Sequence, residues 1–192
     1  ITAAFCCWCW YWDRNYRIMV VSASQQRADA FSQFCLRLLQ EHPDLKHLAP
    51  GPKNRKSLVA FDVAGSVVDQ SPSMKSIGIS GQLTGSRADL IIADDIEVPK
   101  NSQTQNQREK LAELVKEFDA ILKPEPHASV KYLGTPQTED SLYNSLAKRG
   151  YAIRIWPARM PKDVDRYSGQ LAPYIAALGL APGKPTDIKR FS

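Results

Sequence analysis

The chain has 192 residues, of which 43% are hydrophobic, so it can bury the core of one domain and is not of the disordered class. Its formal net charge of +5 weakly favours an anionic partner, because basic domains attract phosphate. The apolar run from Ile1 to Trp12 is too short for a membrane span, which takes roughly 20 residues, and it lacks the flanks of a signal peptide. We expect a buried helix there, in a chain that begins part-way along a longer protein.

Four cysteines bear on metal binding and on the redox setting: Cys6, Cys7, Cys9 and Cys35. Cys6 and Cys9 have the spacing of a zinc-binding pair, but no second pair follows them. Cysteines packed among tryptophans on one helix are more often apolar filling, and their number and spacing do not favour a disulfide framework. A reducing, intracellular setting fits this usage best.

Strands and helices alternate through the first half of the chain. Arg17 to Val21 is a short β-branched run typical of a buried strand. Apolar residues between Ala28 and Leu39 recur at helical spacing, and Pro43 ends that helix. Residues 49–57 have the Pro, Gly, Lys and Asn content of a loop. Two further strands are predicted at 58–63 and 76–80, with a turn-rich stretch at 69–73 between them.

The alternation continues in the second half. After a loop at 81–87, Leu90 to Ala93 is the most hydrophobic strand candidate. Ser102 to Gln105 is a predicted capping box ahead of a long amphipathic helix at 111–122. The remaining predictions are a strand at 130–133, a helix at 138–148, a strand at 153–156 and a linker or tail at 158–192. This order predicts an α/β fold with a mainly parallel sheet.

Polar residues follow three of the predicted strands, at the carboxyl ends where parallel sheets bind ligands. The first strand leads into Ser22 to Arg27, the hydrophobic strand into Asp94 to Glu97, and the strand at 130–133 into Gly134 to Gln137. Taken alone, the first cluster is explained as a helix cap and the third as a turn. Their convergence on one edge of the sheet indicates a site.

Asp94 and Asp95 are the most informative pair, because adjacent carboxylates repel each other unless a cation or a basic group is near. An apolar strand ending in two acids is the Walker B pattern of nucleotide hydrolases, in which the first acid holds Mg²⁺ and a neighbour orients the attacking water. A two-metal nuclease would need further carboxylates on other strand ends. Those ends carry Ser, Thr, Gly and Gln instead, which favours phosphate binding.

Four stretches around these motifs resemble the terminase large subunits of short-tailed podophages of the Autographivirus type. Together they are far more specific than any one motif. They are the Walker B region at Gly81 to Glu97, the coupling motif at Val130 to Thr138, the early segment at Val20 to Ser24 with Arg27 to Ala30, and Tyr151 to Ala158. The resemblance extends from about Ile1 to Phe191.

The resemblance implies a P-loop NTPase-like fold of the RecA/ASCE type, with flanking helices and an incomplete N-terminus. The family's G-x-x-x-x-G-K-[ST] phosphate loop would lie upstream of Ile1, and its nuclease domain would follow the chain. We therefore expect a partial ATPase domain at 1–157 and a linker or tail at 158–192. The parent protein is expected to hydrolyse ATP and cut DNA, and this chain alone to do neither well.

The resemblance also implies a role for each polar cluster. Asp94 would hold the Mg²⁺ that bridges the phosphates of ATP. Asp95 would orient the attacking water, with Glu97 as the alternative because of its longer reach. Thr135 would lie near the γ-phosphate, and Gln137 would relay its presence to the following helix.

Three further residues complete the implied nucleotide site. Ser22 and Ser24 would lie beside the nucleotide at the end of the first strand. Arg87 would act as an arginine finger on a neighbouring subunit of a ring, or is a surface or salt-bridge arginine.

The implied partners are double-stranded viral DNA, a portal protein, a small terminase subunit and further copies of the chain, in the host cytoplasm and transiently on a procapsid. Basic loops that could touch DNA, or are only solvated, carry Lys53, Arg55, Lys56 and Lys100. Two other functions are alternatives for this sequence: a helicase-type nucleic-acid ATPase and a catalytically silent interaction module. The missing phosphate loop favours the silent module for this chain. The intact pairs Asp94-Asp95 and Gly134-Thr135 argue against it for the parent protein.

Overall fold

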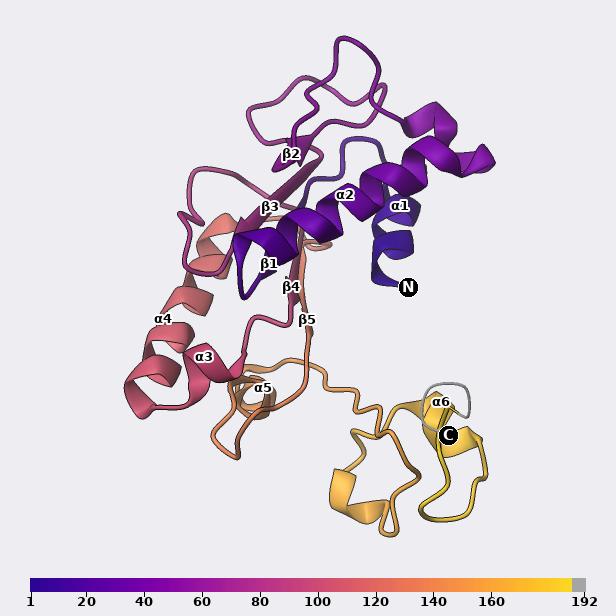
Figure 1. The fold of residues 1–192 in the computed structure, drawn as a ribbon, viewed down its shortest axis with the longest axis vertical. Coiled ribbons are helices and arrows are strands. Elements are labelled where there is room, and N and C mark those ends of the chain that lie inside the picture. The colour runs from indigo at the N-terminus through magenta and orange to yellow at the C-terminus, as the bar shows by residue number, and fades with distance from the viewer. Residues whose placement is uncertain (188–192) are drawn as a thin grey trace. The chain divides into compact units, whose positions relative to one another are not determined.

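The computed structural model describes residues 1–187, and its centre is one five-stranded sheet in the order β2-β3-β1-β4-β5 (Figure 1). Strands β3, β1, β4 and β5 run parallel to their neighbours, and the short β2 pairs antiparallel with β3. The predicted α/β fold with a mostly parallel sheet is therefore confirmed. The strands are β1 (Ile18–Ser22), β2 (Ala60–Phe61), β3 (Met74–Gly78), β4 (Leu90–Asp94) and β5 (Ser129–Leu133).

Helices connect β1 to β2 and β4 to β5, whereas residues 79–89 lead from β3 to β4 without a helix. The two long ones are α2 and α4, and both were predicted from their apolar spacing. The helices are α1 (Thr2–Trp12), α2 (Gln25–Glu41), α3 (Pro99–Ser102), α4 (Gln105–Ile121), α5 (Leu142–Ser145) and α6 (Pro173–Ala177). Short 3₁₀ turns are η1 (Pro43–Leu48), η2 (Leu146–Arg149) and η3 (Asp165–Tyr167).

Helices cover both faces of the sheet, which explains why β1 and β4 are apolar up to their last residues. On one face, α1 and α2 pack with η1 against Ile18, Val20 and Ile92. Side chains alternate along a strand, so their neighbours point to the opposite face. There α4 packs through Phe118 against Tyr132, with ring centroids 6.0 Å apart. The sheet is thus the middle layer of three.

Helix α1 is buried on one side only. Its buried side holds Cys6, Cys7, Cys9 and Trp10, and the indole of Trp10 donates to the Tyr16 carbonyl at 3.0 Å. Burial raises the pKa of the Cys7 thiol to about 12, as expected for cysteines that serve as apolar filling. The opposite side exposes aromatic rings. The prediction of a buried helix is therefore confirmed for one face of α1 only. The exposed rings are Phe5, Trp8, Tyr11 and Trp12.

Three predictions need correction in their bounds. The strand predicted at 58–63 shrinks to the two residues of β2, because Ser57 folds back to bond the Ala60 carbonyl and backbone N–H groups. The strand predicted at 76–80 begins two residues earlier, at Met74, where it pairs with Ile18. The capping box lies at Thr104 and Gln107 rather than at 102–105, because α3 occupies the residues before it.

Two predictions after β5 are wrong. The helix predicted at 138–148 begins only at Leu142, whose backbone N–H donates to the Glu97 carboxylate at 2.7 Å. Residues 153–156 form no strand, because Ile155 makes only one bridge, to Leu171, with no neighbouring strand to extend it.

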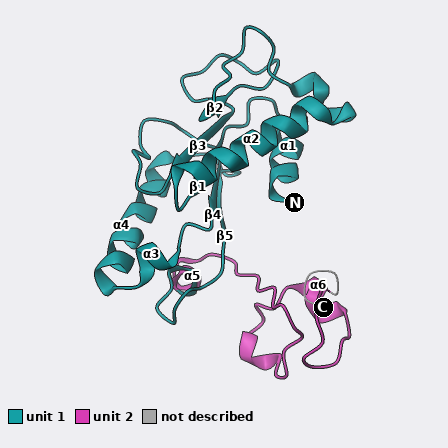
Figure 2. Cartoon of the chain, viewed as in Figure 1, with its two compact units in different colours: residues 1–144 teal, residues 145–192 magenta. Residues whose placement is uncertain are grey.

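The chain divides into two compact units, Ile1–Asn144 and Ser145–Ser192 (Figure 2). The first holds the sheet. The second has a small core of Leu171, Ala172 and Ile175. The linker or tail predicted at 158–192 falls in the second unit, and its role stays a prediction; its residues 188–192 lie outside the described residues. No helix within residues 1–187 is long and apolar enough to cross a membrane.

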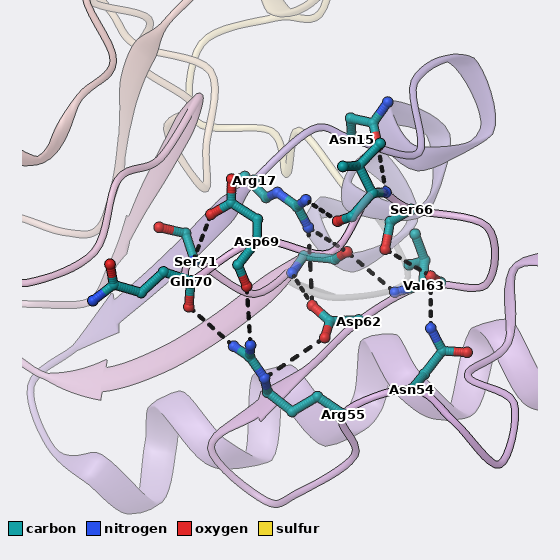
Figure 3. A network of polar contacts seen from close by, with 12 residues as sticks. Asn15, Arg17, Asn54, Arg55, Asp62, Val63, Ser66, Asp69, Gln70 and Ser71 are labelled. Carbon is teal, nitrogen blue, oxygen red and sulfur yellow. Dashed lines mark hydrogen bonds and ion pairs between the residues drawn. The ribbon is translucent and has the colours of Figure 1, made fainter.

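The long connection from η1 to β3 is held by a buried arginine (Figure 3). Arg17 is 3% exposed, and its guanidinium donates to the Val67 carbonyl at 2.7 Å and the Ser73 hydroxyl at 3.2 Å. The Asp62 carboxylate lies 3.9 Å from Arg17 and 3.6 Å from Arg55. A guanidinium can be buried only with such partners, so this network fixes the connection together with the short β2.

Replacing Arg17 tests this explanation. Arg17→Met keeps the apolar stem but leaves the Val67 carbonyl without its buried donor and Asp62 with Arg55 as its only cationic partner among the described residues, so we expect a loss of about 3 kcal/mol of unfolding free energy. Urea denaturation measures it. The control is Arg37→Met, which breaks an exposed pair with Glu41 and should cost less than about 0.5 kcal/mol. Equal losses in the two variants would contradict a structural role for the network.

Candidate functional site

The carboxyl ends of four parallel strands form one row. Ser22 of β1 lies opposite Gly78 of β3 on one side and Asp94 of β4 on the other, and Asp94 lies opposite Leu133 of β5. The residues after Leu133 therefore leave the sheet at the same edge as Ser22 and Asp94. The structure thus brings the three predicted polar clusters together (Figure 1).

The end of β1 combines a buried hydroxyl with a helix cap. Ser22 is 1% exposed, and its hydroxyl has no hydrogen-bond partner within residues 1–187. Ser24 is the N-cap of α2, where its hydroxyl accepts from the Arg27 backbone N–H at 3.4 Å. A Cβ at Gly78 would collide with the backbone between Ser24 and Gln25, so this close approach needs glycine. Ser24 thus has a structural role as a helix cap, whereas the buried hydroxyl of Ser22 has no hydrogen-bond partner among the described residues.

Asp94 lies at the rim of the core, half-buried. Burial raises the pKa of its carboxyl above the usual value, and the negative charge of Asp95 raises it further. The positive charge of Arg27, in the first turn of α2, acts in the opposite direction. Asp94 therefore sits where a further positive charge would stabilise its ionised form.

Asp95 has an uncommon backbone conformation. Its φ of +46° lies in the left-handed region, which aspartate tolerates better than most residues but which still costs energy. The conformation is held by the Asp95 N–H, which donates to the Leu133 carbonyl at 2.9 Å. The side chain of Asp95 is exposed at the sheet edge, next to Asp94.

Glu97 is buried, unlike Asp95. It is 2% exposed, and its carboxylate accepts three hydrogen bonds from the loop after β5. The donors are the Gln137 N–H at 3.2 Å, the Ser141 hydroxyl at 3.0 Å and the Leu142 N–H at 2.7 Å. Its two oxygens are thus engaged in holding a loop.

Thr135 and Gln137 are exposed on that loop. The Gln137 side-chain amide donates to the Thr135 carbonyl at 3.0 Å, which holds these residues in a compact turn. The loop therefore presents small polar groups beside the two aspartates.

Tyr143 is a residue of this edge that sequence analysis missed. Its hydroxyl donates to the Leu133 carbonyl at 3.3 Å, and a Cβ at Gly134 would overlap it. Burial raises the pKa of Tyr143 to about 12, so the hydroxyl stays protonated and able to donate. The pair of a glycine after a strand and a tyrosine nine residues later gives no signal in a sequence alone.

Arg87 is not brought to this edge. It precedes β4, at the amino end of the sheet, whereas Asp94 ends the same strand. Its backbone N–H donates to the Ser71 hydroxyl at 2.9 Å, and its guanidinium donates to the Ala120 carbonyl near the end of α4. A role on a neighbouring subunit stays a prediction.

The donor set at the edge suits a hydrated divalent cation held by few protein ligands. Among residues 1–187, no three His, Cys, Asp or Glu side chains converge to form a metal cage. Mg²⁺ commonly uses one or two carboxylates, with water and phosphate oxygens completing its shell. Asp94 and Asp95 supply such carboxylates, and the spare hydroxyl of Ser22 lies one strand away.

The chain is 50% identical, over 200 aligned residues that cover its whole length, to the terminase large subunit of Enterobacteria phage T3. The match covers 34% of that protein, so the chain spans about a third of its relative's length. No model of a protein family matches the chain. The chain is therefore related to phage terminase large subunits, which confirms the resemblance.

The raised pKa of Asp94 predicts that this residue destabilises the fold in a pH-dependent way. An aspartate with a raised folded-state pKa destabilises the fold above its unfolded pKa, and the cost disappears at lower pH, where both states are protonated. We expect Asp94→Asn to be more stable than the parent chain at pH 7, with the difference vanishing near pH 3. Urea denaturation at both pH values measures it, with the exposed Asp44→Asn as control. An Asp94→Asn variant less stable than the parent at pH 7 would show that the carboxylate is stabilising.

Proposed function

We propose that the chain forms part of an ATP-hydrolysing motor that moves viral double-stranded DNA into a procapsid. The observation that carries this proposal is the Asp94–Asp95 pair at the carboxyl edge of a parallel sheet, beside the buried Ser22 hydroxyl, which has no hydrogen-bond partner within residues 1–187. Its setting is a chain half identical to a terminase large subunit. The proposed fold class is P-loop NTPase-like, of the RecA/ASCE type, with β4 as the Walker B strand.

Each residue at the edge has a proposed role. Asp94 holds Mg²⁺, directly or through water, and Asp95 orients the attacking water. Thr135 lies near the γ-phosphate, and Ser22 offers its spare hydroxyl to the nucleotide or its water shell. When bound, Mg²⁺ neutralises the charge that develops on the phosphates during transfer. The exposure of Asp95 and the full engagement of Glu97 support Asp95 as the water-orienting acid.

The wider assembly is also a proposal. We infer a ring of copies on a portal protein, working with a small terminase subunit in the host cytoplasm, and an endonuclease activity elsewhere in the parent protein. Lys53, Lys56 and Lys100 are exposed and available to DNA phosphates. Arg55 is less available, because its guanidinium bonds the Gln70 and Asp69 carbonyls at 3.2 and 3.1 Å.

A segment exchange tests the proposed reaction. The matching third of the phage T3 terminase large subunit is replaced by this chain, and DNA-stimulated ATP hydrolysis is measured. Asp95→Asn in the chimera should abolish hydrolysis with near-normal nucleotide affinity, because positioning of water is lost while binding is kept. Asp94→Asn should weaken both, and Glu97→Gln should have a smaller effect than Asp95→Asn.

Three outcomes would contradict these assignments. Near-normal rates for Asp95→Asn with a collapse for Glu97→Gln would exchange the roles of the two acids. Normal rates for all three variants would show that β4 is not a Walker B strand. An unsubstituted chimera that packages DNA without hydrolysing ATP would favour a silent module.

The chain alone should bind Mg-ATP weakly. Its 192 residues contain no G-x-x-x-x-G-K-[ST] loop, so the backbone donors and lysine that hold phosphates are missing. Isothermal titration calorimetry should therefore detect at most weak binding. Tight binding would place the nucleotide elsewhere than at Asp94 and Asp95.

A further inference from the structure

The loops after β4 and β5 are joined by two sets of hydrogen bonds. The Leu133 carbonyl, at the end of β5, accepts from the Asp95 N–H at 2.9 Å and from the Tyr143 hydroxyl at 3.3 Å. Two residues beyond Asp95, the Glu97 carboxylate accepts from Gln137, Ser141 and Leu142. The first set fixes the start of the β5 loop and the second fixes its far end.

The contacts of Glu97 do more than fill space in the core. Its three donors are neutral groups of one loop, 40 to 45 residues away in sequence. Burying a carboxylate is costly unless such donors are arranged around it. An apolar residue would fill the space at lower cost but would not fix where the Gln137 and Leu142 amides lie. The carboxylate therefore determines the conformation of the loop.

The loop held by Glu97 is the one that carries Thr135. Thr135 to Asp140 is exposed, with little apolar contact to hold it in place. Without the Glu97 contacts, the loop would be attached only through Leu133 and through the ion pair of the exposed Asp140 with Arg108 of α4, at 3.5 Å, among the polar contacts of the described residues. Because Asp95 is bonded to that same Leu133 carbonyl, the exposed acid and the exposed threonine belong to one hydrogen-bonded body.

We propose that Glu97 is a positioning residue that clamps the loop at 134–142 to the loop after β4, so that Asp95 and Thr135 keep a fixed separation. The proposal rests on the proposed function for its catalytic consequence and on the hydrogen bonds alone for the clamp. Glu97 itself touches neither nucleotide nor water in this role. It differs from a water-orienting acid in what its replacement does to the loop.

Two substitutions of Glu97 remove different numbers of these contacts. Glu97→Ala removes all three contacts. Glu97→Gln keeps an acceptor for the Leu142 N–H and the Ser141 hydroxyl but turns its NH₂ group toward the Gln137 N–H, so one contact is lost. Glu139→Gln is the matched control, since it makes the same chemical change to an exposed acid of the same loop.

Amide hydrogen exchange on the chain tests the clamp without nucleotide. In Glu97→Ala we expect the Gln137 and Leu142 amides to exchange about 10-fold faster or more, as for the loss of a hydrogen bond to a charged acceptor. In Glu97→Gln only Gln137 should change. The amides of β4 and the Glu139→Gln control should match the parent. Unchanged exchange at both amides in Glu97→Ala would overturn the proposal.

The catalytic consequence is measured in the chimera with phage T3 terminase. Glu97→Ala should lower kcat for ATP hydrolysis about 100-fold with KM unchanged, because a small misplacement of reacting groups has an effect of that size. Glu97→Gln should lose less. Faster exchange with a kcat equal to that of Glu139→Gln would make Glu97 merely structural and overturn its positioning role. An unsubstituted chimera without hydrolysis would overturn the proposed function and that role together, while the exchange result would still decide the clamp.

Discussion

Backbone hydrogen bonds between β1, β4 and β5 hold Ser22, Asp94 and Leu133 at one level of the sheet, and the candidate site depends on this register. A slip of one residue would turn each side chain to the other face of the sheet. Ile18, Val20 and Ile92 would then leave the core they share with α1 and α2. Core packing therefore fixes the register, and the register fixes the site.

The same edge carries groups that do not favour folding. The carboxyl of Asp94 is half-buried beside the charge of Asp95, Asp95 has a left-handed backbone, and the Ser22 hydroxyl is buried without a partner among the described residues. A chain selected for stability alone would replace such groups. Their concentration at one end of the sheet, with the well-packed core behind them, is typical of a site where a ligand supplies the missing partner.

The sequence predicts the sheet well and the loops poorly, for a physical reason. Local apolar spacing predicts strands such as Leu90 to Ala93 and the helix around Phe118. The segment after Leu133 does not, because its conformation depends on Glu97, some 40 residues earlier. The predicted helix at 138–148 therefore started too early.

The same difference between local spacing and long-range contacts applies to the residues of the site. Asp94 ends β4, as its position directly after an apolar run predicts, because apolar spacing is a local property of the sequence. Tyr143 was missed because its role comes from a contact with the Leu133 carbonyl that no periodic pattern encodes.

The contrast between Asp95 and Glu97 illustrates what structure adds to spacing. Either acid could reach a nucleotide from the end of β4, and sequence leaves the choice to side-chain length. The two environments differ in kind. The carboxylate of Glu97 is already satisfied by three donors, and releasing it to orient water would leave the Gln137 and Leu142 amides unpaired. Asp95 can turn toward a ligand without breaking a contact of that set, while its backbone stays bonded to Leu133. A clamp and a reactive acid make opposite demands on a carboxylate, so placing them two residues apart allows one loop to meet both.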